Sequence, residues 1–357
     1  MICSSLGIVL MFQHLQSRAP LRNVAPVHVP SLLNPVICED GERYRQMMDE
    51  TCLEEYYSEI EEFSFHSKFF PLCQSTASAL SEAHKQWLSG VSPSQLAQSE
   101  LLVDLAHQIE ESASCLRTPA FFIRLSTRSP KDAVLHVPAF RSIFDDALKV
   151  LENAGDSRSS SQNNKLVALY QALTQSMRCT SGEAAVLLLI TSARIQEDLE
   201  HYTGEGKTFQ VIIREWFDFD VQHEFRAFIW KQKVTAITQY NEMCYFPDLH
   251  ARKEEVQHFM SSTIEKEVLP KITKLPSLVL DIILCPNGEG NWILKVVEIN
   301  PFAEFAGTGL FSWEKDKPTL MGRSPFEFRI QENAPIHASA NIPRSMSDFL
   351  SAASPSL

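Results

Sequence analysis

The sequence predicts an α+β fold in which mostly antiparallel strands pack against helices. The first observation is a set of short apolar runs of strand length, at 120–125, 209–216, 224–230, 233–240, 278–284 and 292–300. The second is that the last four runs form two pairs joined by turn residues, which is typical of β-hairpins. The third is a set of longer stretches with helical spacing of apolar residues, at 40–62, 140–151, 165–177, 182–190 and 252–269.

The strands and the first helix each have a distinct signal. Residues 40–62 combine acids with apolar residues at near-helical spacing. The runs at 120–125 and 209–216 are apolar and each carries an arginine near its end. The run at 224–230 begins with alternating charged and apolar residues, and the run at 233–240 follows after a tight turn. This pattern predicts the first hairpin.

Composition narrows the classes of function. The 357 residues are 44% hydrophobic and 21% charged, which suits two domains or one large fold. There are 32 basic and 44 acidic residues, and the resulting formal charge of −12 does not indicate binding to nucleic acid, which is itself negatively charged. The apolar run at 6–12 is too short to span a bilayer. We therefore expect neither nucleic acid nor a membrane as a partner.

The cysteines indicate a compartment. All eight are scattered along the chain, without a C-x-x-C pair or histidines at zinc spacing. This distribution favours reduced thiols over a disulfide framework. We therefore expect a cytoplasmic protein.

Proline and serine mark segments that we expect to lie outside the core. Residues 1 to about 40 are interrupted by prolines and are expected to be extended or poorly ordered. Residues 155–164 are rich in serine and asparagine, which predicts a flexible surface loop. The tail from Lys315 is rich in proline and serine and is expected to wrap around the fold without a core of its own.

The second hairpin carries the most informative residues. Asp281 lies inside an apolar strand, and Glu298 and Asn300 are two apart on the return strand. Side chains at that spacing share a face, where Asp281 can join them. An acid in an apolar strand needs a cation nearby, and Mg²⁺ prefers such oxygen ligands. The alternative is an edge hairpin whose acids face solvent, and the hairpin alone does not decide between the two.

Three arginines, Arg124, Arg214 and Arg226, lie in apolar strand context, where a guanidinium is unfavourable unless it is paired. One interpretation pairs them with acids, for which the candidates are Glu224, Asp132 and Glu215. The other places them along a cleft that receives phosphate oxygens. Because no G-x-x-x-x-G-K-[ST] loop is present, such a nucleotide site would be built from sheet surfaces. Trp216 is either a packing residue or flanks an adenine.

Several motifs, taken in order, resemble the cell division cycle protein 123 family, whose members have an ATP-grasp nucleotide-binding fold. The matching stretches are 124–125 with 129–133, 177–179 with 188–192 and 198–199, 213–216, 224–228, 280–282, and 298–302 with 310–313. Most of the chain after residue 60 is covered. The stretches Ser129-Pro130-Lys131-Asp132-Ala133 and Asn300-Pro301-Phe302 together are specific.

The resemblance implies a particular site. It implies antiparallel sheets and helices that form two lobes around a cleft for ATP and Mg²⁺. The nucleotide-binding positions are Arg124, Arg214, Glu215, Trp216, Glu224, Arg226, Asp281 and Asn300. The metal-binding positions are Asp281, Glu298 and Asn300. Five positions depart from the family pattern. Arg124 replaces a lysine and keeps its charge, and Glu298 replaces an aspartate, a change with which metal binding is expected to survive. Tyr240 replaces a basic residue, Ile190 a lysine and Leu135 a tryptophan, and these losses would weaken phosphate contacts.

The resemblance also implies a function. Members of the family are assembly chaperones that bring the gamma and alpha subunits of translation initiation factor 2 together, so the gamma subunit is the expected partner. The implied division of the chain is an N-terminal extension at 1–60, partly disordered, an ATP-grasp-like domain at 61–315 with a flexible insertion at 141–176, and a wrapping tail at 316–357. Two alternatives stay open: an ATP-grasp ligase that acts through an acyl-phosphate, and a binding module that has lost nucleotide.

Overall fold

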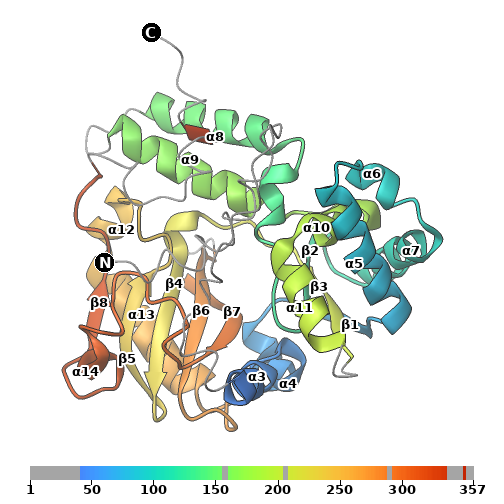
Figure 1. The fold of residues 1–357 in the computed structure, drawn as a ribbon. Coiled ribbons are helices and arrows are strands. Elements are labelled where there is room, and N and C mark those ends of the chain that lie inside the picture. Colours follow the sequence, from blue (N-terminus) through green and yellow to red (C-terminus); the bar gives the residue numbers. More distant parts are fainter. Residues whose placement is uncertain (1–40, 155–159, 204–207, 288–291, 336–348, 351–357) are drawn as a thin grey trace, which may run out of the picture.

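A computed structural model describes residues 41–154, 160–203, 208–287, 292–335 and 349–350. Within these residues the chain forms two β-sheets, each packed against its own set of helices (Figure 1). This mixed architecture confirms the predicted α+β fold class. The segment before residue 41, which we expect to be extended, lies outside the described residues.

The smaller sheet has three antiparallel strands in the order β1-β3-β2. These are β1 (Ser67–Pro71), β2 (Phe121–Leu125) and β3 (Gln210–Glu215). One face packs in a hydrophobic cluster with residues of nearby helices. The helices are α5 (Gln74–Leu88), α6 (Pro93–Leu96), α7 (Glu100–Ser114), α10 (Gly182–Thr191) and α11 (Ala193–Thr203). The other face, which includes Phe122, Arg124 and Arg214, is directed toward the larger sheet.

The larger sheet has five strands in the order β7-β6-β4-β5-β8. These are β4 (Glu224–Trp230), β5 (Lys233–Gln239), β6 (Leu278–Pro286), β7 (Trp292–Pro301) and β8 (Glu327–Arg329). Both predicted hairpins are confirmed, as β4-β5 and β6-β7. Sequence reasoning missed β8, which pairs parallel with β5. The tail therefore contributes a strand to the sheet as well as the short helix α14 (Lys317–Leu320).

Strand β7 contains a β-bulge that controls which side chains face the site. Asp281 pairs with Glu298, but Ile282 pairs with Val296, so Val297 is an extra residue. Trp292, Leu294 and Val296 belong to the hydrophobic cluster on one face, and Ile299 joins the same cluster three residues after Val296. The bulge therefore turns Glu298 and Asn300 to the opposite face, where strict alternation from Val296 would have buried Glu298 in the core.

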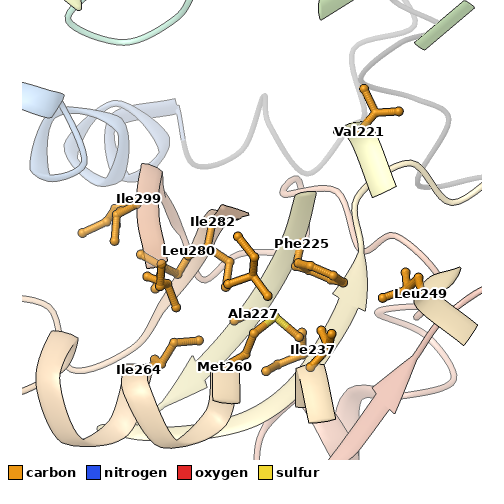
Figure 2. Close-up of a cluster of buried hydrophobic side chains, with 14 of the residues drawn as sticks. Val221, Phe225, Ala227, Ile237, Leu249, Met260, Ile264, Leu280, Ile282 and Ile299 are labelled. Atoms are coloured by element: carbon orange, nitrogen blue, oxygen red, sulfur yellow. The ribbon is translucent and has the colours of Figure 1, made fainter. Parts of the chain in front are cut away.

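The core face of the larger sheet is covered by helices. Figure 2 shows Phe225, Ala227, Leu280 and Ile282 of the sheet close to Met260. The helices that contribute to this cluster are α4 (Leu53–Ile60), α8 (Phe140–Ala154), α9 (Ser161–Gln175), α12 (Pro247–Ala251) and α13 (Lys253–Thr263), which continues as a π-helical turn (Ile264–Val268). Within the described residues, no helix is both long enough and apolar enough to cross a membrane.

Two segments contribute more to the core than expected. Helix α3 (Gly41–Glu50) precedes α4, whose Leu53 and Ile60 are fully buried in the same cluster as the sheet. The segment predicted as an insertion at 141–176 consists largely of α8 and α9. The flexible loop predicted at 155–164 is wrong from Ser161 on, because α9 begins there, and residues 155–159 lie outside the described residues. The serine tract has a capping function there: the Ser160 hydroxyl accepts a hydrogen bond from the Asn163 N–H at 3.1 Å.

Candidate functional site

The larger sheet carries a row of polar side chains on the face opposite its helices. Glu298, Asp281, Arg226, Thr238 and Arg329 stand in register on β7, β6, β4, β5 and β8. Residues in register on neighbouring strands share a face, so the five lie side by side across the sheet. The convergence of Asp281, Glu298 and Asn300 that the hairpin predicts is therefore observed.

Apolar groups cover this face on both sides of the row. At one end, Phe228 and Val279 pack with Phe311 and Trp313 from the loop after β7. At the other end, Ile283 and Cys285 pack with Phe65, and Phe122 of the smaller sheet lies against them. The charged groups of Glu298, Asp281 and Arg226 thus lie between two apolar layers, where charge interactions are screened less than at the surface.

Asp281 and Arg226 form a bidentate ion pair. The Arg226 Nε and Nη2 atoms donate to the two carboxylate oxygens of Asp281, each at 2.7 Å. Asn300 Nδ2 donates to Asp281 Oδ2 at 3.1 Å, so both oxygens of this buried carboxylate accept hydrogen bonds. Burial raises the pKa of Asp281, and Arg226 opposes that change. Arg226 Nη1 also donates to the Gly307 carbonyl at 2.7 Å, and a Cβ at Gly307 would lie 2.8 Å from the same nitrogen.

Arg124 and Glu298 join the two sheets. Arg124 Nη1 on β2 donates to Glu298 Oε2 on β7 at 2.9 Å, and their side chains are 3% and 15% exposed. The other nitrogens of Arg124 donate to the carbonyls of Leu125 and Thr127. Burial raises the pKa of Glu298, but Lys131 and Arg124 outweigh this and hold that pKa well below its usual range. Glu298 therefore stays ionised at neutral pH.

Lys131 belongs to the same site, although sequence reasoning did not select it. Its Nζ lies 3.1 Å from the Tyr240 hydroxyl, and both Lys131 and Arg226 lie 5.2 Å from the centre of the Tyr240 ring. Asp132 fixes the loop that carries Lys131, because it accepts hydrogen bonds from the Ser192 hydroxyl and the Arg194 N–H at the start of α11. Lys131 lies in the Ser129-Pro130-Lys131-Asp132-Ala133 stretch that carries part of the family resemblance, which is the signal that could have selected it.

These side chains form one group, which we call the intersheet cluster. Its members are Arg124, Lys131, Glu224, Arg226, Tyr240, Asp281, Glu298 and Asn300. Three bases and three acids balance in formal charge. The partners proposed from the sequence for the arginines are wrong for Arg124 and Arg226, because these pair with Glu298 and Asp281. The candidate metal ligands and the candidate phosphate-binding groups therefore neutralise each other.

The side chains of Arg214, Glu215 and Trp216 form no hydrogen bond with side chains of the intersheet cluster among the described residues. Arg214 is fully buried and donates to the Val297 carbonyl and the Ser64 hydroxyl. Trp216 Nε1 donates to Asp218 Oδ1 at 2.7 Å, and the ring lies edge-on to Phe122. Glu215 lines a separate cavity of about 730 Å³, whose lining includes no member of the cluster. A nucleotide-binding role for these three residues stays a prediction.

The donor set decides which metals suit this site. Within the described part of the chain, no three His, Cys, Asp or Glu side chains group closely enough to hold a metal ion. The predicted set consists of two carboxylates and one amide, all with oxygen donors on one face of the hairpin. Such hard oxygen donors fit Mg²⁺, which completes its coordination with water and phosphate.

The fold and the intersheet cluster define a mixed α+β protein with a charged site between two sheets. The D123 family matches residues 167–349, which is more than half of the chain. The chain belongs to the D123 family. This confirms the family resemblance seen in the sequence.

Curated relatives carry the name translation initiation factor eIF2 assembly protein. One from Vanderwaltozyma polyspora is 30% identical over 173 residues, which cover 44% of this chain and 46% of the relative. One from Schizosaccharomyces pombe is 26% identical over 162 residues, covering 42% and 48%. One from Xenopus laevis is 23% identical over 161 residues, covering 43% and 46%. The chain therefore matches less than half the length of each of these relatives.

A solved structure shows a similar fold. The structure of Cdc123 from Schizosaccharomyces pombe matches with a TM-score of 0.58 over 81% of this chain and 98% of that chain. Sequence identity in this comparison is 18%, so the likeness concerns the fold alone. It supports the mixed arrangement of antiparallel sheets and helices.

The titration of Glu224 provides a test of the cluster. Burial raises the pKa of Glu224 to about 7, Lys131 opposes the increase and Asp281 adds to it. The folded chain therefore binds this proton more readily than the unfolded chain between about pH 4.5 and pH 7, so this group's contribution to the free energy of unfolding falls as pH rises through that window. We expect the free energy of unfolding of Glu224→Gln, taken relative to that of the unmodified chain, to increase by about 1–2 kcal/mol between about pH 5 and pH 8, after allowance for solvent screening.

Urea unfolding at several pH values measures this difference. Glu254→Gln, at an exposed position on α13, is the matched control. A stability difference between the chain and Glu224→Gln that does not change with pH would contradict the assigned environment of Glu224.

Proposed function

We propose that this chain is an ATP·Mg²⁺-binding factor that assists the assembly of translation initiation factor 2. The observation that carries the nucleotide part is the intersheet cluster, in which Arg124 and Lys131 from the side of the smaller sheet meet Arg226, Asp281 and Glu298 of the larger sheet. In this proposal the space between the sheets is an ATP-grasp-like cleft. Arginine is well suited to phosphate there, because its planar fork binds two oxygens at once.

In this proposal Asp281, Glu298 and Asn300 hold the magnesium ion. The ion would neutralise part of the phosphate charge, and the three nearby bases would neutralise the remainder. Both oxygens of Asp281 accept hydrogen bonds from Arg226. Arg226 must therefore give up at least one of its hydrogen bonds to Asp281 when the metal binds. The phosphates then offer its guanidinium a new partner that is negatively charged, as the Asp281 carboxylate is. This exchange keeps each charge paired, which a site of low exposure requires.

The partner is proposed from the family. Relatives named as eIF2 assembly proteins match about two-fifths of the chain, and the chain belongs to the D123 family. By resemblance the gamma subunit is the direct partner. Because function depends on sites and partner surfaces and does not follow from fold, this part of the proposal needs its own test.

A second candidate is a binding module that has lost nucleotide. The pairing within the intersheet cluster favours it, because Arg226 and Arg124 already satisfy the two acids. Tyr240 also stands where the family has a basic residue, which removes one charge that a triphosphate would contact. The ATP-grasp ligase would use the same residues and stays a prediction.

Calorimetric titration with ATP tests the nucleotide proposal. We expect Mg²⁺ to tighten ATP binding by about tenfold or more in the unmodified chain and by less than about twofold in Asp281→Asn, because the variant loses a metal ligand. Asp316→Asn is the matched control, since Asp316 pairs with Arg329 at the far edge of the same sheet. Absence of ATP binding with and without Mg²⁺ would favour the second candidate.

Affinity capture from a eukaryotic cell extract tests the partner. The tagged chain is expected to retain the gamma subunit of translation initiation factor 2, identified by mass spectrometry, and Asp281→Asn is expected to retain less of it when ATP and Mg²⁺ are present. Asp316→Asn again provides the control. If the chain binds ATP but retains no subunit of this factor above the level of the tag alone, the assembly role is wrong and the nucleotide site stands.

A further inference from the structure

Strand β7 lies at the edge of the larger sheet, with β6 as its one partner among the described strands. An edge strand presents backbone N–H and carbonyl groups that need partners, most of all where a bulge interrupts the ladder. The bulge at Val297 immediately precedes Glu298. The hydrogen bonds at this edge therefore bear directly on where the Glu298 carboxylate lies.

Arg214 supplies two of these bonds. Its Nη1 donates to the carbonyl of the bulged residue Val297 at 2.6 Å, and its Nη2 lies 3.5 Å from the carbonyl of Val296. The guanidinium stacks near Phe65 and Phe122, with ring centres at 4.8 and 5.2 Å. No acid among the described residues forms an ion pair with Arg214, and its Nε has no hydrogen-bond partner there. Burial, together with the nearby Arg124, lowers the pKa of this guanidinium to about 9.

Two hydroxyls complete the set. The Ser64 hydroxyl donates to the Val296 carbonyl at 3.0 Å and accepts from Arg214 Nη2 at 2.7 Å. On the other side of Glu298, the Tyr56 hydroxyl accepts from the Ile299 N–H at 2.9 Å. Both side chains are 2% exposed. Backbone groups of residues 296, 297 and 299 are thus held by side chains from three separate segments, α4, the loop before β1, and β3.

We propose that Arg214, Ser64 and Tyr56 form an edge clamp that fixes the β7 bulge and thereby positions Glu298 against Arg124 and beside Asp281. Arg214 is then a positioning residue and makes no contact with nucleotide. As a statement about geometry the proposal stands by itself, and as a contribution to metal binding it rests on the proposed function. A guanidinium suits this position because it can donate to several carbonyls in one plane, which a lysine cannot do.

The charge-neutral variants Tyr56→Phe and Ser64→Ala test the clamp. Each has a matched control nearby. Tyr57→Phe loses a hydroxyl that bonds Phe65 and Ser67, and Ser67→Ala loses one that bonds the Phe65 carbonyl, and neither hydroxyl touches β7. The first measurement is the crystal structure of each nucleotide-free variant, in which we expect Glu298 to move out of hydrogen-bond distance of Arg124. The controls are expected to keep the 2.9 Å contact between Arg124 and Glu298.

The second measurement is ATP affinity by calorimetry, with and without Mg²⁺. Mg²⁺ increases ATP affinity in the proposed site, and we expect this increase to be about five- to tenfold smaller in the clamp variants, which corresponds to the loss of one hydrogen bond. The ATP affinity measured without Mg²⁺ is expected to change by less than about twofold. Arg214→Met is expected to show the same split if it folds. If Arg214 contacts the nucleotide directly, Arg214→Met will instead weaken ATP binding equally with and without Mg²⁺. That result would overturn its assignment as a positioning residue.

The two measurements separate the clamp from the proposed function. If the unmodified chain binds no ATP, the proposed function fails, and a Glu298 displaced in both Tyr56→Phe and Ser64→Ala still supports the clamp. An unchanged contact between Arg124 and Glu298 in both variants overturns it. So does a displacement of equal size in Tyr57→Phe and Ser67→Ala.

Discussion

The ion pair between Arg124 and Glu298 is the constraint on which the site depends. It joins two residues that are 174 positions apart and belong to different sheets. Both groups are largely removed from water, so removal of one partner leaves a buried charge with its direct ion pair lost, at a cost of up to about 3–5 kcal/mol. Lys131 offsets part of this cost when Glu298 is the group that remains. Because the pair connects the two sheets, it holds the inner face of the smaller sheet next to the row of polar side chains on the larger sheet.

The row itself depends on a single irregularity in β7. The bulge at Val297 brings Glu298 and Asn300 to the face of Asp281, and the edge clamp holds the backbone on both sides of Glu298. The larger sheet thereby presents Glu298, Asp281 and Arg226 on three adjacent strands, and each of these charged groups has an ion-pair partner. A ligand that contains both a divalent cation and phosphate can exchange with these pairs without leaving any of the charges unpaired, which is the physical case for ATP·Mg²⁺.

The hairpins and the shared face of Asp281, Glu298 and Asn300 were predictable, because turn residues and strand periodicity are local signals. The bulge had a signal too, since the buried Val296 and Ile299 are three apart where alternation requires two. The partner of Arg124 was not predictable, because it depends on how two sheets pack. The partner of Arg226 was not predictable either, because it depends on the pairing of β4 with β6, which are not consecutive along the chain. The same is true of Arg214, whose apolar strand context indicates burial but does not show that its acceptors are carbonyls of a distant strand.

A double-mutant cycle on Arg124→Met and Glu298→Gln, followed by urea unfolding of the nucleotide-free chain, tests the central interaction most directly. The contact between the sheets predicts a coupling free energy of about 1–3 kcal/mol between the two positions, as for other residues in direct contact in one buried network. Additive effects, with a coupling below about 0.3 kcal/mol, would mean that the two side chains do not meet in solution and would contradict the account.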